Sequence, residues 1–125
     1  MQPPDVVLLG ADWQPRALLR AQLIEEGFDV VATDSWPMMR RHLRVGVKPR
    51  LAIVNLKGLP HPDAVLRDLR VLMKPDHVLV ITAIGTVEAA VVDRLGFRHM
   101  TRPVVVKNLV DAAAEMIHAS EQHSH

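Results

Sequence analysis

Residues 51–60 read LAIVNLKGLP. A short apolar run, LAIV, leads into Asn55, and Gly58 and Pro60 then end the run. Runs of this kind are typical of a strand that is buried on both faces of a parallel sheet. The last side chain of such a strand lies at the carboxyl end of the sheet, where open α/β folds bind their ligands. The stretch therefore predicts a buried strand that places an uncharged amide at a candidate site.

Four further segments have the pattern of strands. They are 6–9, 29–33, 77–82 and 98–101. The first and third are nearly as apolar as 51–55. The second and fourth are shorter or more polar, as strands near the edges of a sheet would be.

Apolar residues recur at helical spacing in the segments between these strands. The predicted helices are 13–26, a segment from Asp34 or Ser35 to about Gly46, 63–73, 87–95 and about 105–119. A strand followed by a helix, five times over, predicts an α/β layer fold with a parallel sheet. No linker or internal repeat interrupts the pattern, so we expect one domain over residues 1–125. Its core covers about 5–118, and a polar tail, 119–125, is expected to fray.

The composition argues against several classes of protein. With 125 residues, of which 49% are hydrophobic and 23% charged, the chain suits one folded domain with a core. A net charge of +1 gives no reason to expect a nucleic acid or membrane partner. The lack of cysteine excludes disulfides and thiol catalysis, and no apolar run is long enough to span a bilayer. The start has no basic signal-peptide region, so we expect a cytoplasmic protein.

A site at the carboxyl edge of the predicted sheet would be built from the residues at the strand ends. These are Gly10, Ala11 and Asp12 after 6–9, Asn55 and Lys57 with 51–55, Thr82 and Ala83 with 77–82, and Arg102 and Pro103 after 98–101. Asp12 is the one acidic residue of this set. The edge is therefore expected to carry more positive than negative charge.

The order and spacing of four segments resemble the receiver domain of bacterial two-component response regulators. The segments are VVLLGADWQPRALLRAQLIEEGFDVVAT (6–33), KPRLAIVNLKGLP (48–60), HVLVITA (77–83) and LGFRHMTRPV (95–104). The resemblance covers about residues 5–118. It implies a CheY-like, flavodoxin-like (βα)5 fold, which is a three-layer sandwich around a five-stranded parallel sheet in the order 2-1-3-4-5. It also implies a cis peptide bond between Arg102 and Pro103.

The chain departs from the receiver pattern at the residues that carry the chemistry of that family. The two magnesium-binding acidic residues of the family align with Gly10 and Ala11, and its phospho-accepting aspartate aligns with Asn55. An amide is a poor nucleophile, and Mg²⁺ prefers carboxylate and phosphate oxygens, of which the Asp12 carboxylate remains. We therefore expect no aspartyl phosphorylation, no metal and no cofactor.

Three further positions of the resemblance bear on the site. Thr82 is retained, the family's lysine aligns with Arg102, and its switch aromatic aligns with His99. We expect the Arg102 guanidinium to contact Asp12 or a backbone carbonyl, because arginine is always charged. Asn55 either caps the loop that follows it or keeps a signalling role. With fewer carboxylates, like-charge repulsion is relieved, and the domain is expected to be stable in one conformation.

The leading hypothesis is an atypical response-regulator receiver domain that acts in signal transduction by protein–protein contact. The resemblance implies that the contact face is formed by the helix 87–95, the strand 98–101 and the helix 105–119. This face would bind a signalling or regulatory protein, or a second copy of the chain. We expect Val91 or Val92 to be exposed on it. The residues expected on the face are Glu88, Val91, Val92, His99, Lys107, Val110, Asp111 and Ala114.

Two other classes of function are compared with this hypothesis. The alternative is a sensor of a small molecule or anion that binds at the sheet mouth near Arg102, where Gly10 and Ala11 leave room. An enzyme is the least favoured class, because the sequence shows no nucleophile–base pair, no phosphate-binding glycine loop and no set of metal ligands.

The remaining histidines, arginines and tryptophans fit ordinary structural roles. The seven histidines are scattered and lack the spacing of metal ligands. The run 39–50 carries five basic residues and no acid, which suits either a solvated helix face or a docking patch for an acidic partner. Trp13 and Trp36 are expected to pack in the core or at the rim. There, Trp13 would fill the space left by the missing acidic residues.

Overall fold

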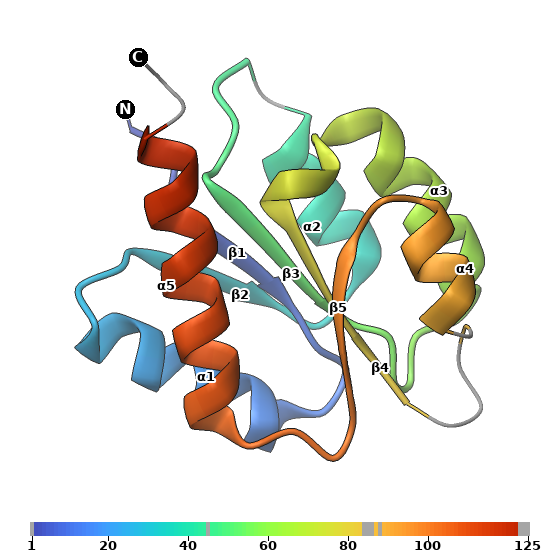
Figure 1. Ribbon diagram of the computed structural model, residues 1–125, viewed down its shortest axis with the longest axis horizontal. Coiled ribbons are helices and arrows are strands. Elements are labelled where there is room, and N and C mark those ends of the chain that lie inside the picture. Colours follow the sequence, from blue (N-terminus) through green and yellow to red (C-terminus); the bar gives the residue numbers. More distant parts are fainter. Residues whose placement is uncertain (1, 45, 84–86, 88, 123–125) are drawn as a thin grey trace.

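The computed structural model describes residues 2–44, 46–83, 87 and 89–122. Strands and helices alternate along this part of the chain (Figure 1). All five predicted strand segments are confirmed, with ends that differ by at most one residue. The elements are β1 (Val6–Leu9), α1 (Trp13–Glu25), β2 (Val30–Thr33), α2 (Trp36–Leu43), β3 (Leu51–Asn55), α3 (Pro62–Leu72), the 3₁₀ turn η1 (Pro75–His77), β4 (Val78–Thr82), α4 (Ala89–Arg94), β5 (Arg98–Thr101) and α5 (Val106–Gln122).

The described residues form a five-stranded sheet in the order β2-β1-β3-β4-β5, and each neighbouring pair is parallel. This confirms the predicted fold class and the strand order 2-1-3-4-5. β3 lies between β1 and β4, where Ile53 is paired with Leu8 on one side and with Leu79 on the other. Because the strands run in the same direction, their carboxyl ends meet at one edge of the sheet.

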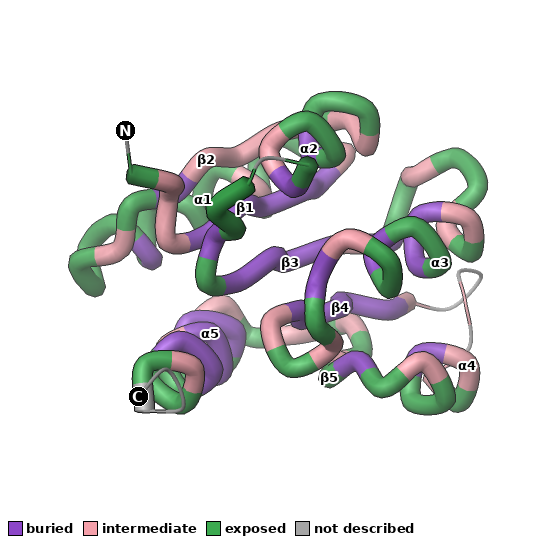
Figure 2. Tube along the Cα trace, turned by 90° about the horizontal axis from the view of Figure 1, so that it is seen from above, coloured by how far each residue is buried: buried purple, intermediate pink, exposed green. Residues whose placement is uncertain are grey.

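Helices cover both faces of the sheet, which explains why β1, β3 and β4 are so apolar. Leu8 and Ile53 belong to the hydrophobic cluster that includes α1 and α5. Val7 and Val54 belong to the cluster that includes α2, α3 and α4. Figure 2 shows the buried residues along the central strands and the exposed residues on the outer turns of the helices.

The helices α2 and α4 are shorter than predicted. α2 starts as expected after Ser35, whose Oγ accepts a backbone N–H three residues on at 3.4 Å, but the helix ends at Leu43 rather than near Gly46. α4 covers Ala89–Arg94 rather than 87–95. Apolar spacing locates a helix better than it locates its ends, because the terminal residues keep only part of the backbone hydrogen bonding.

The helix α5 is longer than predicted. It continues to Gln122, so residues 119–122 are helical and do not belong to a frayed tail. A contact that is distant in sequence holds its last turn, since the Glu121 carboxylate pairs with the guanidinium of Arg50. Although α5 is the longest described helix, neither it nor any other described helix is long and apolar enough to cross a membrane.

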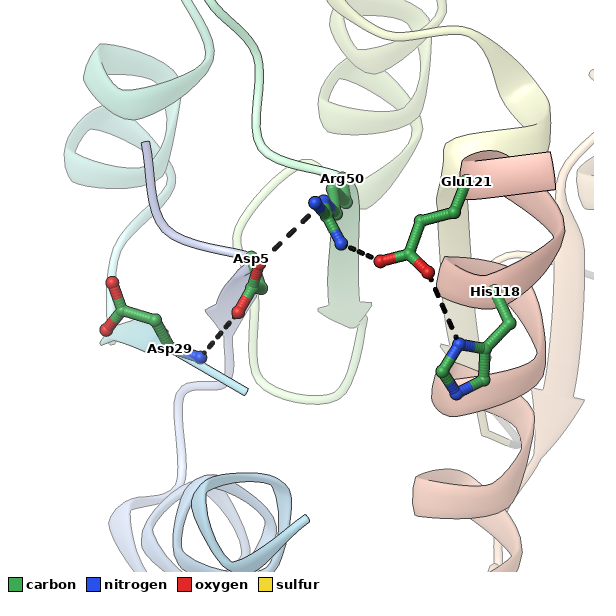
Figure 3. A network of polar contacts seen from close by, with 5 residues as sticks. All are labelled: Asp5, Asp29, Arg50, His118 and Glu121. Atoms are coloured by element: carbon green, nitrogen blue, oxygen red, sulfur yellow. Dashed lines mark hydrogen bonds and ion pairs between the residues drawn. The ribbon is translucent and has the colours of Figure 1, made fainter. Parts of the chain in front are cut away.

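A polar network joins the starts of three strands, at the end of the sheet away from the candidate site (Figure 3). Arg50 Nε lies 3.8 Å from Asp5 Oδ1, and Asp5 Oδ2 accepts the Asp29 N–H at 2.8 Å. Arg50 also pairs with Glu121, whose second carboxylate oxygen lies 3.5 Å from His118 Nδ1. Asp5, Asp29 and Arg50 directly precede β1, β2 and β3. The network therefore connects the starts of these strands with the end of α5.

Candidate functional site at the carboxyl edge of the sheet

The carboxyl ends of β1, β3, β4 and β5 bring the predicted site residues to one edge of the sheet. Gly10 follows β1, and its N–H donates to a carbonyl of β2 at 3.1 Å. Asn55 ends β3 opposite Ile81 of β4. Next to it, the Arg102 N–H donates to the carbonyl of Thr82 at 2.8 Å. The backbone of the sheet therefore fixes where each of these residues lies.

Asn55 is half-buried, and its side chain is bonded to the loop that follows β3. Its Oδ1 accepts the Lys57 N–H at 3.1 Å. An asparagine that bonds to a backbone N–H two residues on stabilises a turn. Gly58 continues this turn at φ +77°, and a Cβ added to it would lie 3.1 Å from the Cβ of Ala11. Asn55 therefore caps the loop that follows it, and a signalling role for this residue stays a prediction.

The acidic residue of the predicted site, Asp12, is paired with Lys57. Its Oδ2 lies 3.5 Å from Lys57 Nζ, and both side chains are about half exposed, at 53% and 52%. An ion pair this exposed adds little stability, but it gives the Asp12 carboxylate a cationic partner other than Arg102. The predicted contact between Asp12 and Arg102 is therefore wrong. Lys57 takes this place because the loop after β3 lies against the loop after β1.

Thr82 has its hydroxyl engaged by the neighbouring strand. The side chain is only 2% exposed, and Thr82 Oγ1 lies 3.0 Å from Thr101 Oγ1. The two residues are paired in the register of β4 and β5, so the sheet itself aligns the two hydroxyls. A buried hydroxyl that already has a partner is satisfied without a ligand.

Arg102 lines a cavity at the sheet mouth. Its bond to Pro103 is cis, as the resemblance implied. Arg102 Nη1 is buried and has no hydrogen-bond partner, so the expected carbonyl contact is not made by this nitrogen. The cavity has a volume of about 90 Å³ and lies between the sheet, α1 and α5. Its polar lining residues are Arg16, Asn55 and Arg102, and the rest of the lining is apolar apart from Gly10.

Arg16 of α1 is a site residue to which the sequence assigned no role. Its Nη1 donates to the Gly10 carbonyl at 2.6 Å and lies 3.4 Å from the Ala11 carbonyl. It therefore holds the loop after β1 from within the first turns of α1. The available signal was its position, four residues after Asp12 at the start of a helix that begins at the sheet mouth.

His99, the predicted switch position, connects β5 to α4. Its Nε2 lies 2.9 Å from Asp93 Oδ1, and its Nδ1 is buried without a partner. The Asp93 partner was not predicted. The two residues lie on different elements, and only the turn at Gly96, φ +86°, brings those elements together.

Two residues of the predicted contact face are buried. Val92 and Val110 lie in the two hydrophobic clusters, so the expectation that Val92 could be exposed is wrong. Both residues lie on the inner faces of their helices, where side chains three or four positions apart share a face with the core. Neither is available to a partner in this structure.

The other described residues of the face are accessible to different degrees. Val91 and Ala114 are half-buried, while Lys107 and Asp111 are exposed and lie 3.5 Å apart between Nζ and Oδ2. Glu88 lies outside the described residues. The accessible part of the face is therefore polar with a small apolar contribution.

The two tryptophans differ in their surroundings. Trp13 is 67% exposed, so the expectation that it fills the space left by the acidic residues is wrong. It is the first residue of α1, and its side chain projects outward from there. Trp36 is half-buried and packs against the cluster of α2, α3 and α4, as expected.

The basic residues of the run lie on the surface, and the described histidines are not gathered at one site. Arg40 and Arg41 of α2 and Arg44, which directly follows it, are exposed and line a surface depression beside Trp36. Within the described residues, no group of three or more histidine, aspartate or glutamate side chains is arranged to hold a metal ion.

Comparisons with known proteins find similarity in structure. No family model matches the chain, and no curated protein matches it in sequence. The chain superposes with a TM-score of 0.79 and 18% identity on a CheY-like response regulator receiver domain protein from Methanospirillum hungatei, over 95% of this chain and 97% of that one. For NtrX from Brucella abortus the TM-score is 0.78 at 19% identity, over 97% of this chain. For an adenylate cyclase from Rhodopirellula baltica it is 0.74 at 18%, over 94% of this chain and 89% of that one.

These comparisons establish the fold. The chain spans only 28% of the length of NtrX, so it corresponds to one part of that protein. At identities below one fifth, the similarity concerns the backbone and carries no information on individual site residues. The chain has the CheY-like receiver fold that its sequence implied.

Two substitutions of Asn55 test the description of the mouth. Asn55→Ala removes the acceptor of the Lys57 N–H and should lower the free energy of unfolding by about 0.5–1.5 kcal/mol. Asn55→Asp keeps an oxygen acceptor near cationic side chains and should change the free energy of unfolding by less than about 0.5 kcal/mol. Urea unfolding followed by circular dichroism measures both. If Asn55→Asp lowers the free energy of unfolding by more than about 2 kcal/mol, the mouth does not carry excess positive charge.

Proposed function

We propose that this chain is an atypical receiver domain that acts in signal transduction by protein–protein contact, without aspartyl phosphorylation or Mg²⁺ switching. The observation that carries the proposal is the state of Asn55. An amide stands at the carboxyl end of β3, and its oxygen already accepts the Lys57 N–H. The receiver fold of the chain supports a signalling role, and a cytoplasmic location goes with that role.

The groups at the mouth do not favour phosphoryl transfer. That reaction to a protein side chain needs a carboxylate nucleophile and a metal ion. Gly10 and Ala11 carry no side-chain oxygen, the Asp12 carboxylate faces Lys57, and the Thr82 hydroxyl is bonded to the next strand. These bonds within the chain hold the mouth in one arrangement. Such a domain presents a constant surface to its partner and needs no catalytic activity.

The contact surface in this proposal is the accessible part of α4, β5 and α5. It consists of the half-buried Val91 and Ala114 and the exposed Lys107 and Asp111. The bond from His99 to Asp93 holds β5 and α4 in a fixed relation next to these residues. Charged side chains around a small apolar centre suit an interface of modest size. The partner is a signalling or regulatory protein or a second copy of the chain.

A second candidate function is the sensing of a small anion at the sheet mouth. The specific observation in its favour is the buried Nη1 of Arg102, which has no hydrogen-bond partner. A charged donor in this state is stabilised by an anion that supplies the missing acceptor. In this function, the ligand and not a phosphoryl group would be the signal.

The phosphorylation-independent proposal is tested with acetyl phosphate and Mg²⁺. We expect the intact mass of the wild-type protein to stay unchanged, because an amide does not form an acyl phosphate. The positive control is the variant with Gly10→Asp, Ala11→Asp and Asn55→Asp. A Cβ at Gly10 would lie 3.5 Å from the Cβ of Arg16, which is an ordinary contact. A stable gain of one phosphoryl group by the wild type, lost in Asn55→Ala, would contradict the proposal.

The contact face is tested with two alanines on different helices. Ala114→Arg introduces a bulky charge on the proposed face and should reduce partner capture by about tenfold or more, as expected at the centre of an interface. Ala21→Arg on the exposed side of α1 is the matched control and should leave capture unchanged. Quantitative mass spectrometry of affinity pull-downs from the native host measures the effect, and sedimentation velocity measures self-association. Equal capture by both variants would place the interface elsewhere.

A further inference from the structure

We infer that the cavity between the sheet, α1 and α5 binds a small monocarboxylate with a short apolar tail, whose carboxylate pairs with Arg102. The inference rests on the second candidate function, anion sensing at the mouth. It is independent of whether the domain is phosphorylated, because it concerns the guanidinium and the apolar walls of the cavity and not a nucleophile at the end of β3.

The charges of the cavity select an anion. Two guanidinium groups and no carboxylate are among its described lining residues. Arg16 Nη1 is bonded to the Gly10 carbonyl, whereas Arg102 Nη1 is buried without a partner. Within the described part of the chain, neither arginine forms an ion pair. A buried charged donor that lacks an acceptor is unfavourable, so an anion placed there gains a charge-assisted hydrogen bond.

The cavity has room for a small organic acid. Its volume is about 90 Å³. One ordered water needs about 10–15 Å³ of such volume, so the space holds several waters or the few heavy atoms of a short-chain acid. Acetate and propionate fit within it, and propionate is the probe that also reaches the apolar walls.

The walls of the cavity distinguish a carboxylate from phosphate. Leu19, Ile81 and Leu109, from α1, β4 and α5, are buried members of its lining. Inorganic phosphate carries oxygens on all sides and would have to bury some of them against these side chains, which is strongly unfavourable. A short-chain carboxylate places its charge at one end and its apolar tail at the other. Its two oxygens also match the planar fork of arginine.

A ligand bound at Arg102 has a direct connection to the proposed contact face. The Arg102 N–H donates to the Thr82 carbonyl, and Arg102 directly follows β5. β5 carries His99, whose ring is bonded to Asp93 of α4. A shift of Arg102 towards a carboxylate would therefore act on the strand that adjoins α4.

The experiment is a titration of the ¹⁵N-labelled full chain, followed by amide chemical shifts at constant ionic strength. Sodium propionate should give saturable shifts at Gly10, Arg102 and Val104, with a dissociation constant in roughly the millimolar range or below. Propionamide, which is neutral and of similar shape, should bind at least about tenfold more weakly, because it lacks the charge-assisted bond. Inorganic phosphate and chloride should give no saturable shift at these residues.

Two arginine variants locate the charge. Arg102→Gln should weaken propionate binding by about tenfold or more. Arg98→Gln, on an exposed arginine of β5 outside the cavity, is the matched control and should bind propionate like the wild type. If Arg102→Gln does not fold, the comparison of propionate with propionamide on the wild-type protein shows whether the charge of the ligand is needed for binding.

Each outcome has a defined meaning. The absence of saturable propionate shifts, or equal binding of propionate, propionamide and phosphate, would overturn the proposed site. Propionate shifts confined to the cavity residues would support the site and overturn sensing as the function. Shifts that extend through His99 into α4 would support both.

Discussion

The burial of β3 on both faces is the constraint on which the rest of the structure depends. Ile53 faces the cluster of α1 and α5, and Val54 faces the cluster of α2, α3 and α4. A shift of the strand by one residue would move each side chain to the opposite face, so the register of β3 between β1 and β4 is strongly specified. The position of Asn55 at the sheet mouth follows from this register. The mouth is therefore fixed in position whether or not it carries the carboxylates of a phosphorylation site.

The two ends of the sheet differ in how their charges are compensated. At the strand starts, Arg50 lies between the carboxylates of Asp5 and Glu121, so the cation is balanced on both sides. At the mouth, Asp12 pairs with Lys57, and Arg102 is left without an acidic partner among the described residues. The absence of carboxylates at Gly10, Ala11 and Asn55 thus has two consequences. It argues against phosphorylation, and it leaves a cation that favours an anion. Because carboxylates are missing from the mouth, Arg102 Nη1 is left without an acceptor among the described residues.

The sequence predicted the layers because these depend on patterns that act over a few residues, and the strand order was implied by the resemblance to receiver domains. The apolar run at 51–55 and its counterparts in β1 and β4 require helices on both faces, and five such units leave few topologies. The position of Asn55 at the end of its strand followed from the same patterns, whereas the departures at Gly10 and Ala11 followed from the resemblance to receiver domains. These parts of the candidate site could therefore be predicted from the sequence.

Other features depend on contacts between elements and were not predicted. Lys57 reaches Asp12 because two loops lie against each other, which local spacing does not reveal. Val91 and Val92 are both compatible with an apolar stripe, and only the packing of α4 decides that Val92 is the buried one. Trp13 is exposed although large aromatic residues favour burial, and its place in the first turn of α1 decides this. The cavity beside Arg102 arises between the sheet, α1 and α5 and has no signature in any one of these elements.

In the proposed function, bonds within the chain hold the mouth in one state, and the mouth does not respond to a phosphoryl group. The most direct test is the amide spectrum of the ¹⁵N-labelled wild-type protein with beryllofluoride and Mg²⁺, which together mimic an aspartyl phosphate. Fluoride and Mg²⁺ without beryllium serve as the reference. We expect the same spectrum in both conditions at Asn55, Thr82 and His99. Saturable shifts at these three residues that require beryllium would contradict the proposed function.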